Sequence, residues 1–309
     1  MIPAEENGRG AVYLDGALVE EANVALTSPG FAYAVCVFEG IPGYCPEAGA
    51  SLLFRADDHV ARLFASMDAI GLAPPWSAEA LVRDLSAIVA AHADEVDFHL
   101  RIMVWPDGPT EIGCSEPVRT GIVFRPLPNG RGPLSSPATV RTSLVARAPD
   151  NVLPASIKAT ANYLNGRRAV LEAKRRGAEP ALVTAAGCLA EGPTANLFLV
   201  RGGRLITPSL DQSILPGITR DTIIVLAARH GIETEERAVA PEEAQAADEA
   251  FFTGSLCEVR PIASFDGMPL RSTAKDSITS ELARDYGRLV RDRGTSGGWV
   301  HVVRSPRAL

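Results

Sequence analysis

The sequence has very few lysines, although it does not lack positive charge. Only three of its 30 basic residues are lysines (Lys158, Lys174 and Lys275), and the others are arginines. Acidic residues outnumber basic ones by 37 to 30, which gives a formal net charge of −7. Nucleic acids and anionic membranes favour a basic surface, so we expect neither as the main partner. An anionic ligand is expected to bind only in a local pocket.

Long apolar runs and paired cysteines are also missing. No uninterrupted apolar stretch approaches the roughly 18 residues that cross a bilayer. The first ten residues, MIPAEENGRG, lack the basic start and the apolar core of a signal peptide. The five cysteines are scattered and form no C-x-x-C pair, which argues against a zinc site or a disulfide framework. We therefore expect no membrane partner, no metal and a cytoplasmic location.

Length and composition favour two globular domains. A chain of 309 residues is long for one compact core, and its 46% hydrophobic and 22% charged residues are ordinary values for a globular protein. The segment PLPNGRGPLSSP is dense in proline, glycine and serine and is interpreted as a linker. The expected division is a small domain over residues 1–125, a linker over 126–137, a large domain over 138–290 and a C-terminal tail over 291–309.

The spacing of apolar residues predicts the main helices and strands. Apolar residues that recur every three or four positions predict helices over residues 57–70, 77–93, 162–176 and 220–230. Short alternating or continuous apolar runs predict strands, with a hairpin at Asp15-Gly16. Thr219 precedes the last of these helices and is expected to cap it.

The first of four segments with unusual chemistry is IKATANYL, residues 157–164. Lys158 is flanked here by small and apolar residues, between a predicted strand and a predicted helix, in a chain that otherwise uses arginine. Burial of a lysine disfavours its charged form. A neutral amine is the form that makes a Schiff base with a carbonyl group. An ordinary surface lysine in a loop is the alternative interpretation.

The other three segments offer an acid and two turns that suit an anion. Glu191, in AEGPTANLFLV, ends a strand before a tight turn that needs no glutamate, so it is a candidate buried acid; a solvated turn residue is the alternative. Gly217, in ILPGITRD, precedes a helix whose exposed amides suit a phosphate. FTGSL, residues 252–256, is a turn with amides and hydroxyl groups. Helix capping and turn formation explain both turns without a ligand.

Together these features match the needs of one cofactor, pyridoxal 5′-phosphate (PLP). Its aldehyde forms a Schiff base with a lysine, an acid keeps its ring nitrogen protonated so that the ring accepts electrons, and its phosphate needs hydrogen-bond donors. Lys158, Glu191 and the two turns offer these groups.

The same segments resemble the fold-type IV (class IV) PLP-dependent aminotransferases, and most of all the branched-chain amino acid aminotransferases. The similar blocks are VFEGI from residue 37, KATANYL from 158, AEGPTANLF from 190, LPGITR from 215 and ADEAFFTGS from 247. They occur in the family's order between about residues 13 and 267. The resemblance implies the two-domain fold of the D-amino-acid and branched-chain aminotransferases, with a small α+β domain and a large α/β domain that binds the cofactor. It also implies a homodimer or a larger homo-oligomer.

The resemblance assigns cofactor contacts residue by residue. Lys158 is implied to form the Schiff base and to move a proton between the substrate α-carbon and C4′ of the cofactor. Glu191 is implied to pair with the ring nitrogen, and Tyr163 to bond the phenolic oxygen. The implied phosphate-binding residues are Arg62, Gly217, Ile218, Thr219 and Ser255, the last at a position where the family usually has threonine.

The resemblance is weaker at the residues that bind the substrate. Arg101 occupies the family's carboxylate-recognition position, and Tyr33 is expected to reach the neighbouring subunit's site. His99 stands where the branched-chain enzymes usually have a tyrosine, and Pro42 stands where a basic residue is common. A histidine satisfied within its own strand is the alternative interpretation of His99. The implied substrate-binding residues are Tyr33, Phe38, His99, Arg101 and Leu256.

The implied reaction is a ping-pong transamination between an amino acid and a 2-keto acid such as 2-oxoglutarate, with branched-chain or similar hydrophobic L-amino acids favoured. An aminodeoxychorismate lyase, or another specialised-pathway PLP enzyme of the same fold, is one alternative. A non-catalytic PLP-binding protein is another, although the catalytic residues are all present. D-amino-acid and R-selective amine transaminases usually carry a Thr-Arg-Gly-type loop where this chain has WPDGP, residues 105–109, which argues against them.

Overall fold

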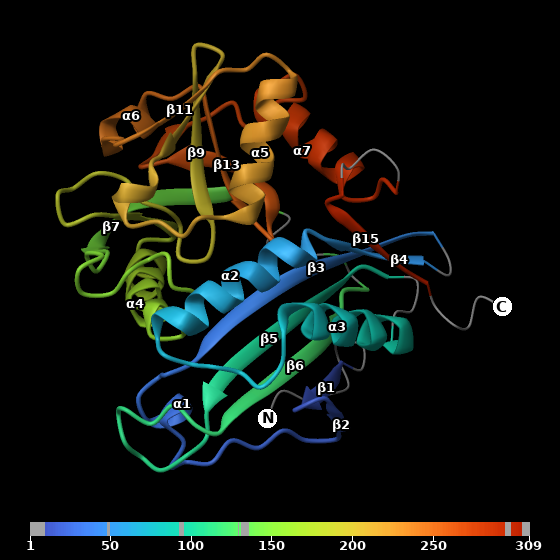
Figure 1. The fold of residues 1–309 in the computed structure, drawn as a ribbon. Helices are drawn as coiled ribbons and strands as arrows, with labels where there is room; N and C mark the ends of the chain where they lie inside the picture. Colours follow the sequence, from blue (N-terminus) through green and yellow to red (C-terminus); the bar gives the residue numbers. More distant parts are fainter. Residues whose placement is uncertain are drawn as a thin grey trace. The chain divides into compact units, whose positions relative to one another are not determined.

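The computed structural model describes residues 10–47, 50–92, 96–128, 130, 136–293 and 298–304, and the chain divides into two compact units (Figure 1). Unit 1 comprises Met1–Gly130, Ile157–Ala161 and Leu289–Leu309. Unit 2 comprises Arg131–Ser156 and Asn162–Arg288. The segment Ile157–Ala161, which contains Lys158, therefore folds with unit 1 although residues of unit 2 flank it on both sides.

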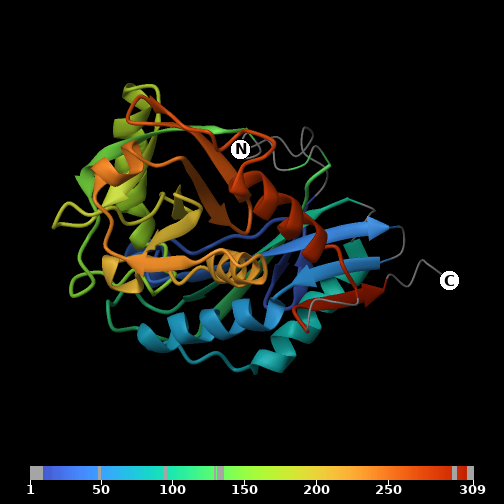
Figure 2. The ribbon, with the colours of Figure 1, turned by 90° about the horizontal axis from the view of Figure 1, so that it is seen from above.

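Unit 1 is built on a seven-stranded antiparallel sheet in the order β15-β4-β3-β5-β6-β1-β2. Helices α2 (Ala56–Ala69) and α3 (Ala78–His92) cover one face of this sheet (Figure 2), and α1 (Pro29–Ala32) is a single turn. The predicted helices over 57–70 and 77–93 are confirmed to within one residue. The strands are β1 (Ala11–Leu14), β2 (Ala17–Val19), β3 (Val37–Glu47), β4 (Ala50–Phe54), β5 (Phe98–Pro106), β6 (Val118–Pro126) and β15 (Val300–Arg304).

Side chains along β3 and β5 alternate between the face that packs against the helices and the opposite face, on which Phe38 and Arg101 lie. Val37, Ile41 and Leu100 are fully buried in the cluster that packs against α2 and α3. Successive side chains of a strand point to opposite faces, so Phe38 and Arg101 lie on the face away from these helices. The hairpin predicted at Asp15-Gly16 is confirmed, because β1 and β2 pair from Val12↔Val19 to Leu14↔Ala17.

Backbone pairing holds the segment Ile157–Ala161 against the start of β3. Val37 and Ala159 form an antiparallel bridge. The Phe38 amide donates to the Lys158 carbonyl at 3.0 Å, and the Lys158 amide donates to Ser66 Oγ in α2 at 3.1 Å. These bonds are the physical reason that Lys158 belongs to unit 1, whereas the sequence placed it inside a continuous large domain.

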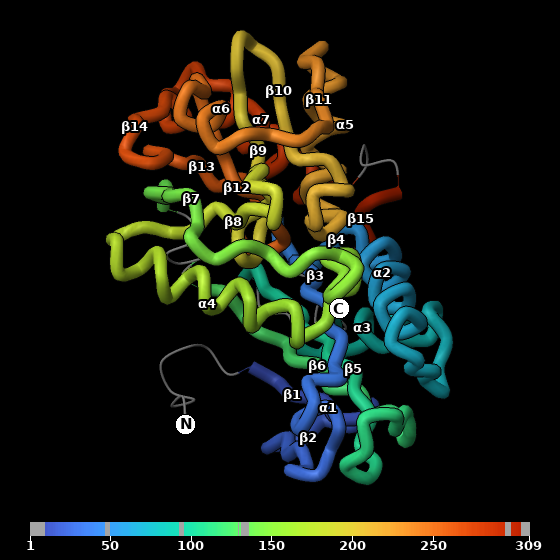
Figure 3. The backbone as a smooth tube through the Cα atoms, turned by 90° about the vertical axis from the view of Figure 1, so that its left-hand side faces the viewer, coloured from blue at the N-terminus to red at the C-terminus, as the bar shows by residue number. Residues whose placement is uncertain are grey.

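Unit 2 contains an eight-stranded mixed sheet, whose main path runs β11-β10-β9-β12-β13-β7-β8, with β14 paired to β13. The pairs β10/β11, β13/β7 and β7/β8 are parallel. Helix α4 packs against β7 and β8 (Figure 3), where Ala169 is buried in one cluster with Leu182, Ala190 and Ile214. The strands are β7 (Ala138–Ala146), β8 (Glu179–Val183), β9 (Asn196–Arg201), β10 (Arg204–Pro208), β11 (Thr234–Arg237), β12 (Glu249–Gly254), β13 (Glu258–Phe265) and β14 (Met268–Pro269).

The helices of unit 2 are α4 (Asn162–Arg175), α5 (Ile218–Arg229), α6 (Pro241–Gln245) and α7 (Ile278–Leu289), with a 3-10 turn at Leu210–Gln212. Helix α4 confirms the prediction over 162–176, whereas α5 begins two residues before the predicted start. The prediction that Thr219 caps α5 is wrong: Gly217 is the N-cap, and Thr219 lies within the first turn. A glycine has no side chain, so the N-cap residue itself provides no capping side chain to the first amides of α5.

The C-terminal region differs from the expected tail. Strand β15 pairs antiparallel with β4, from Val300↔Phe54 to Arg304↔Ala50, and the valines of VHVVR suit such a strand. Residues 294–297 and 305–309 of the expected tail lie outside the described residues, as do residue 129 and residues 131–135 of the expected linker and residues 1–9. The four expected ranges, taken as folding domains, remain a prediction.

Enlarging Ala169 should destabilise unit 2. The Ala169 side chain is fully buried between α4 and β8, so Ala169→Leu forces extra volume into a packed contact and should lower the free energy of unfolding by about 1–3 kcal/mol. Arg168→Leu, on the exposed side of the same helix, should change it by less than about 0.5 kcal/mol. Urea denaturation followed by circular dichroism compares the two variants; equal effects would show that this contact is not tightly packed.

Candidate active site

In unit 1, the aromatic ring of Phe38 brings Lys158 and Arg101 together. Lys158 Nζ lies 4.9 Å from the centroid of this ring, and Arg101 Cζ lies 4.4 Å from it. Phe38 is only 7% exposed, so the ring is a fixed apolar surface with two cations against it. Three of the residues predicted for the site are therefore neighbours: the candidate reactive lysine and two candidate substrate-binding residues.

On the helix-covered face of β3, Glu39 forms a buried ionic cluster with His59 and Arg62 of α2. Arg62 Nε donates to Glu39 Oε1 at 2.6 Å, and Arg62 Nη2 donates to Oε2 at 3.0 Å. His59 Nδ1 lies 2.8 Å from Oε2, and because a carboxylate only accepts, Nδ1 carries the proton. The side chains of Glu39 and His59 are 0% and 1% exposed. The pair with Glu39 uses two of the five N–H donors of Arg62 and fixes the plane of its guanidinium group.

The charges in this cluster follow from burial and from mutual contact. Burial alone would raise the pKa of Glu39, but the charge of Arg62 and the contact with His59 outweigh it and hold that pKa well below its usual range. Burial lowers the pKa of His59, and the nearby charges of Arg62 and Lys158 act in the same direction. At neutral pH the cluster therefore contains an ionised Glu39, a charged Arg62 and a neutral His59.

His99 lies two residues before Arg101 on β5, on the same face of the sheet as Phe38 and Arg101, whereas Tyr33 lies at the end of α1. His99, on β5, is 8% exposed, and its ring lies against the backbone of β3: a Cβ at Gly40 would be 2.5 Å from His99 Nε2. The absence of a side chain at Gly40 therefore makes room for the imidazole. Tyr33, at the C-terminal end of α1, is 44% exposed. Its expected contact in a neighbouring subunit stays a prediction.

In unit 2, Glu191 is fixed by three donors. Arg147 Nη2 lies 2.9 Å from Oε1, while Asn196 Nδ2 and the Leu215 amide donate to Oε2 at 2.9 and 3.1 Å. Glu191 is 5% exposed, so the predicted buried acid is indeed a buried carboxylate with a charged partner. The alternative of a solvated turn residue is excluded.

The predicted anion site at Gly217 lies at the N-terminus of helix α5. Helix α5 has 12 residues, and Gly217 gives it no capping side chain. A Cβ at Gly217 would lie 1.9 Å from Asn196 Oδ1, so another residue there would displace Asn196. The Thr253 hydroxyl, fully buried at the end of β12, has no hydrogen-bond partner among the described residues. Because Thr253 is the cross-strand partner of Asn196, the two side chains share a face of the sheet.

The remaining predicted residues of unit 2 lie on adjacent elements. Tyr163 is half-buried in the first turn of α4. Ser255 and Leu256 form the turn between β12 and β13, directly after Thr253 and Gly254. Their roles stay predictions.

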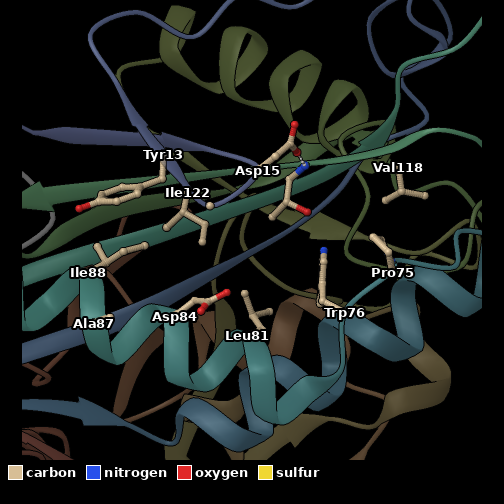
Figure 4. A pocket seen from close by; sticks show the side chains of 12 residues that line it. Tyr13, Asp15, Pro75, Trp76, Leu81, Asp84, Ala87, Ile88, Val118 and Ile122 are labelled. Atoms are coloured by element: carbon tan, nitrogen blue, oxygen red, sulfur yellow. Dashed lines mark hydrogen bonds between the residues drawn. The ribbon is translucent and has the colours of Figure 1, made fainter.

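The cavities described in unit 1 do not contain the candidate reactive lysine. One cavity of about 400 Å³ lies between α3, β1 and β6 (Figure 4), and none of the predicted site residues lines it. A second cavity, of about 340 Å³, is lined in part by Cys36 and Thr160. The Thr160 amide donates to the Cys36 carbonyl, which joins the Lys158 segment to the residue before β3. Within the described ranges, no helix is long and apolar enough to cross a membrane and no cluster of three or more metal-ligating side chains occurs.

Sequence analysis missed the residues that hold the predicted ones in place. His59 and Ser66 lie three positions before and four positions after the predicted Arg62 in α2 and share its helix face, so polar residues on an otherwise apolar face were an available signal. Glu39 lies inside the VFEGI block, where alternation predicts an inward side chain. Arg147 follows β7 directly, and no local pattern marks it as the partner of a residue 44 positions later (191 − 147).

Comparison with known proteins identifies the family. The profile of the family described as amino-transferase class IV matches residues 37–265. The chain belongs to this family. The predicted resemblance and fold class are confirmed: this class IV aminotransferase is a PLP-dependent enzyme that transfers amino groups between amino acids and keto acids.

Similar proteins cover nearly the whole chain. The branched-chain-amino-acid aminotransferase of Pseudomonas aeruginosa is 31% identical over 289 residues, 91% of this chain and 93% of that protein. The enzyme of the same name from Escherichia coli K12 is 29% identical over 302 residues, 94% of this chain and 97% of that one. The crystal structure of the branched-chain aminotransferase of Thermoproteus uzoniensis with norvaline superimposes with a TM-score of 0.87 at 35% identity, over 95% of this chain and 99% of that chain.

A further solved relative carries the cofactor. The PLP form of the branched-chain amino acid aminotransferase of Thermobaculum terrenum has a TM-score of 0.87 at 33% identity, over 95% of this chain and 98% of that chain. The residues of the present aminotransferase fit PLP by their own chemistry. They offer a lysine amine at 158, a buried ionic pair of Arg147 and Glu191, the N-terminal turn of α5 after Gly217, and a Thr253 hydroxyl that has no hydrogen-bond partner among the described residues.

The stability of the aminotransferase should fall in mild acid because of His59. Its pKa is lowered by folding, so the unfolded chain binds a proton that the folded one does not, and stability is lost as pH falls through about 6.5, the ordinary histidine value. Glu39 acts in the same direction at lower pH, because folding lowers its pKa too. His59→Gln should therefore flatten the decrease in the free energy of unfolding between pH 7.5 and 5.5.

Urea denaturation at the two pH values tests this difference. His301→Gln, which removes a histidine whose side chain is 43% exposed, should leave the decrease as in the parent. A decrease of equal size in the His59→Gln variant would contradict a neutral, buried His59.

Proposed function

We propose that this class IV aminotransferase acts on branched-chain or similar hydrophobic L-amino acids, with a 2-keto acid such as 2-oxoglutarate as the acceptor, in a ping-pong reaction. The observation that carries the proposal is the contact of Lys158 Nζ with the nearly buried ring of Phe38. It puts the reactive amine beside an apolar surface, which suits an apolar substrate side chain. The branched-chain names of the similar proteins support the same preference.

Lys158 is proposed to carry out the proton transfers. PLP, when bound, supplies an aldehyde carbon that takes up the amino group and a ring that accepts electrons from the substrate α-carbon. Lys158 Nζ removes the proton from that α-carbon and delivers it to C4′. Hydrogen bonds of the residue 158–160 backbone to Phe38, to Cys36 just before β3, and to the Ser66 side chain of α2 limit the motion of Nζ to the side chain itself.

The other residues are proposed to bind and orient the cofactor. Glu191 pairs with the ring nitrogen, and Tyr163 donates to the phenolic oxygen. The phosphate is bound by the amides of Ile218 and Thr219 after Gly217, by the Ser255 hydroxyl and by Arg62. The position of Ile218 and Thr219 in the first turn of α5, directly after the N-cap Gly217, supports this role, since helix N-terminal amides are good donors to an anion. Glu39 supports the role of Arg62, because it fixes the guanidinium plane.

Arg101 is proposed to bind the substrate carboxylate, with Phe38, Leu256 and a neighbouring subunit's Tyr33 along the substrate side chain. His99 is proposed to contact the substrate, in place of the usual tyrosine. Because His99 and Pro42 depart from the family pattern, an aminodeoxychorismate lyase or another specialised PLP enzyme is the second candidate. The cross-strand pairing of Pro42 with His99 puts both departures at one place in the sheet.

We also propose a homodimer, or a larger homo-oligomer, in the cytoplasm. Four apolar side chains between residues 24 and 33 are exposed by 44% to 78%, and such a group suits a subunit interface. None of the five cysteines, all of them within the described residues, forms a disulfide, which suits a reducing compartment.

The substrate preference can be tested from the absorption of bound PLP. Adding leucine or valine should remove the visible band of the bound cofactor, because the amino group is transferred to it, whereas D-alanine should not. Glutamate should remove it too, if 2-oxoglutarate is the acceptor. A band that persists with every one of these donors, together with release of pyruvate from aminodeoxychorismate, would favour the lyase.

Replacing the proposed reactive lysine gives the sharpest test of the mechanism. Lys158→Ala should lower kcat by roughly 10²- to 10⁴-fold or more, the cost of losing a positioned acid–base group. Lys174→Ala removes an exposed lysine of α4 and should leave kcat unchanged. Steady-state kinetics with leucine and 2-oxoglutarate measures both; near-parental turnover in Lys158→Ala would exclude the proposed mechanism.

A further inference from the structure

Arg147 makes a buried ion pair with the proposed ring-nitrogen partner, Glu191. The atoms Arg147 Nη2 and Glu191 Oε1 are 2.9 Å apart, and the two side chains are only 10% and 7% exposed. A charge-assisted bond of this kind is stronger than one between neutral groups. An exposed ion pair would be weakened by solvent, but this one is largely removed from it.

Strand β8 fixes the backbone of both partners. Arg147 follows β7, and its amide donates to the carbonyl of Val183 in β8 at 2.7 Å. On the other side, Leu182 of β8 exchanges two backbone bonds with residues 190 and 191, each of 2.8 Å. The arginine and the carboxylate therefore meet because both chain segments are tied to the same strand.

Asn196 and the Leu215 amide also donate to Glu191, and unlike Arg147 they are uncharged. Asn196 Nδ2 and the Leu215 amide bind Oε2 at 2.9 and 3.1 Å, and both are neutral. Neutral donors orient a carboxylate, whereas a full positive charge in contact also stabilises its ionised form strongly. The contact with Arg147 therefore favours the ionised form of Glu191 as well as fixing its position.

We propose that Arg147 is a positioning residue that keeps Glu191 ionised and thereby keeps a proton on the ring nitrogen of bound PLP. This inference rests on the proposed pairing of Glu191 with that nitrogen. The shared proton can reside on the nitrogen, with an ionised carboxylate, or on a carboxylate oxygen, with a neutral nitrogen. Arg147 is in direct contact with the carboxylate, so its charge would favour the arrangement in which that carboxylate is ionised and the proton is on the nitrogen.

The test locates this proton by ¹⁵N NMR of PLP labelled at the ring nitrogen and bound to the enzyme. In the parent, and in Arg147→Lys, which keeps a positive donor, the resonance should have the position of a protonated ring nitrogen. In Arg147→Gln, which keeps a donor but no charge, it should shift toward that of an unprotonated nitrogen. The kcat of Arg147→Gln should fall by roughly tenfold to a hundredfold, as for other residues that orient a functional group.

Controls separate this inference from a structural role and from the proposed function. Arg204→Gln, which breaks exposed ion pairs with Glu233 and Glu235 in the same unit, should change neither the resonance nor kcat. Arg147→Met is a second neutral replacement, of similar length, should Arg147→Gln not fold. A lower thermal stability with an unshifted resonance in both neutral variants would overturn the inference and leave Arg147 a structural residue.

The variant Glu191→Gln distinguishes a failure of the role proposed for Arg147 from a failure of the proposed pairing of Glu191 with the ring nitrogen. Loss of ring protonation in Glu191→Gln, but not in the neutral Arg147 variants, would reject only the role of Arg147. Retention of the proton in Glu191→Gln would reject the proposed pairing itself.

Discussion

Backbone hydrogen bonds between residues 158–160 and the start of β3 are the constraint on which the chemistry of unit 1 depends. They make five residues, flanked by unit 2 on both sides, part of unit 1. Because the backbone of Lys158 is fixed, its amine is confined to the neighbourhood of the Phe38 ring. The chain must also leave unit 2 and return to it within these few residues, so an insertion or deletion here would shift the lysine relative to β3.

Helix α2 contacts both the Lys158 segment and the buried carboxylate of Glu39. One helix face carries His59, Arg62 and Ser66: the first two bind Glu39 of β3, and the third accepts the Lys158 amide. An uncompensated charge in such a place would be costly, but Glu39 and Arg62 neutralise each other while His59 stays neutral. The guanidinium group and the backbone of the lysine segment are thus held by one face of one helix.

Local sequence signals predicted what depends on local structure. Apolar spacing predicted α2, α3 and α4 nearly to the residue. The type of residue and its neighbours marked Lys158 and Glu191 as candidates, and the burial expected of Glu191 is confirmed. The partners Glu39 and Arg147 were missed because each is set by pairing between elements distant in sequence. The same holds for β15, which needs β4 as a neighbour, and for Thr219, whose capping role failed because α5 begins one residue before it.

In unit 2, hydrogen bonds connect Glu191 to the proposed phosphate-binding turn before α5. Asn196 Nδ2 donates both to Glu191 Oε2 and to the Leu215 carbonyl, each at 2.9 Å, and the Leu215 amide returns to the same carboxylate at 3.1 Å. The other end of that side chain, Oδ1, occupies the space where a Cβ of residue 217 would lie. Gly217 is therefore required by Asn196 as well as by the turn. Any side chain there would displace the amide that orients Glu191, so the acid and the anion site are expected to fail together.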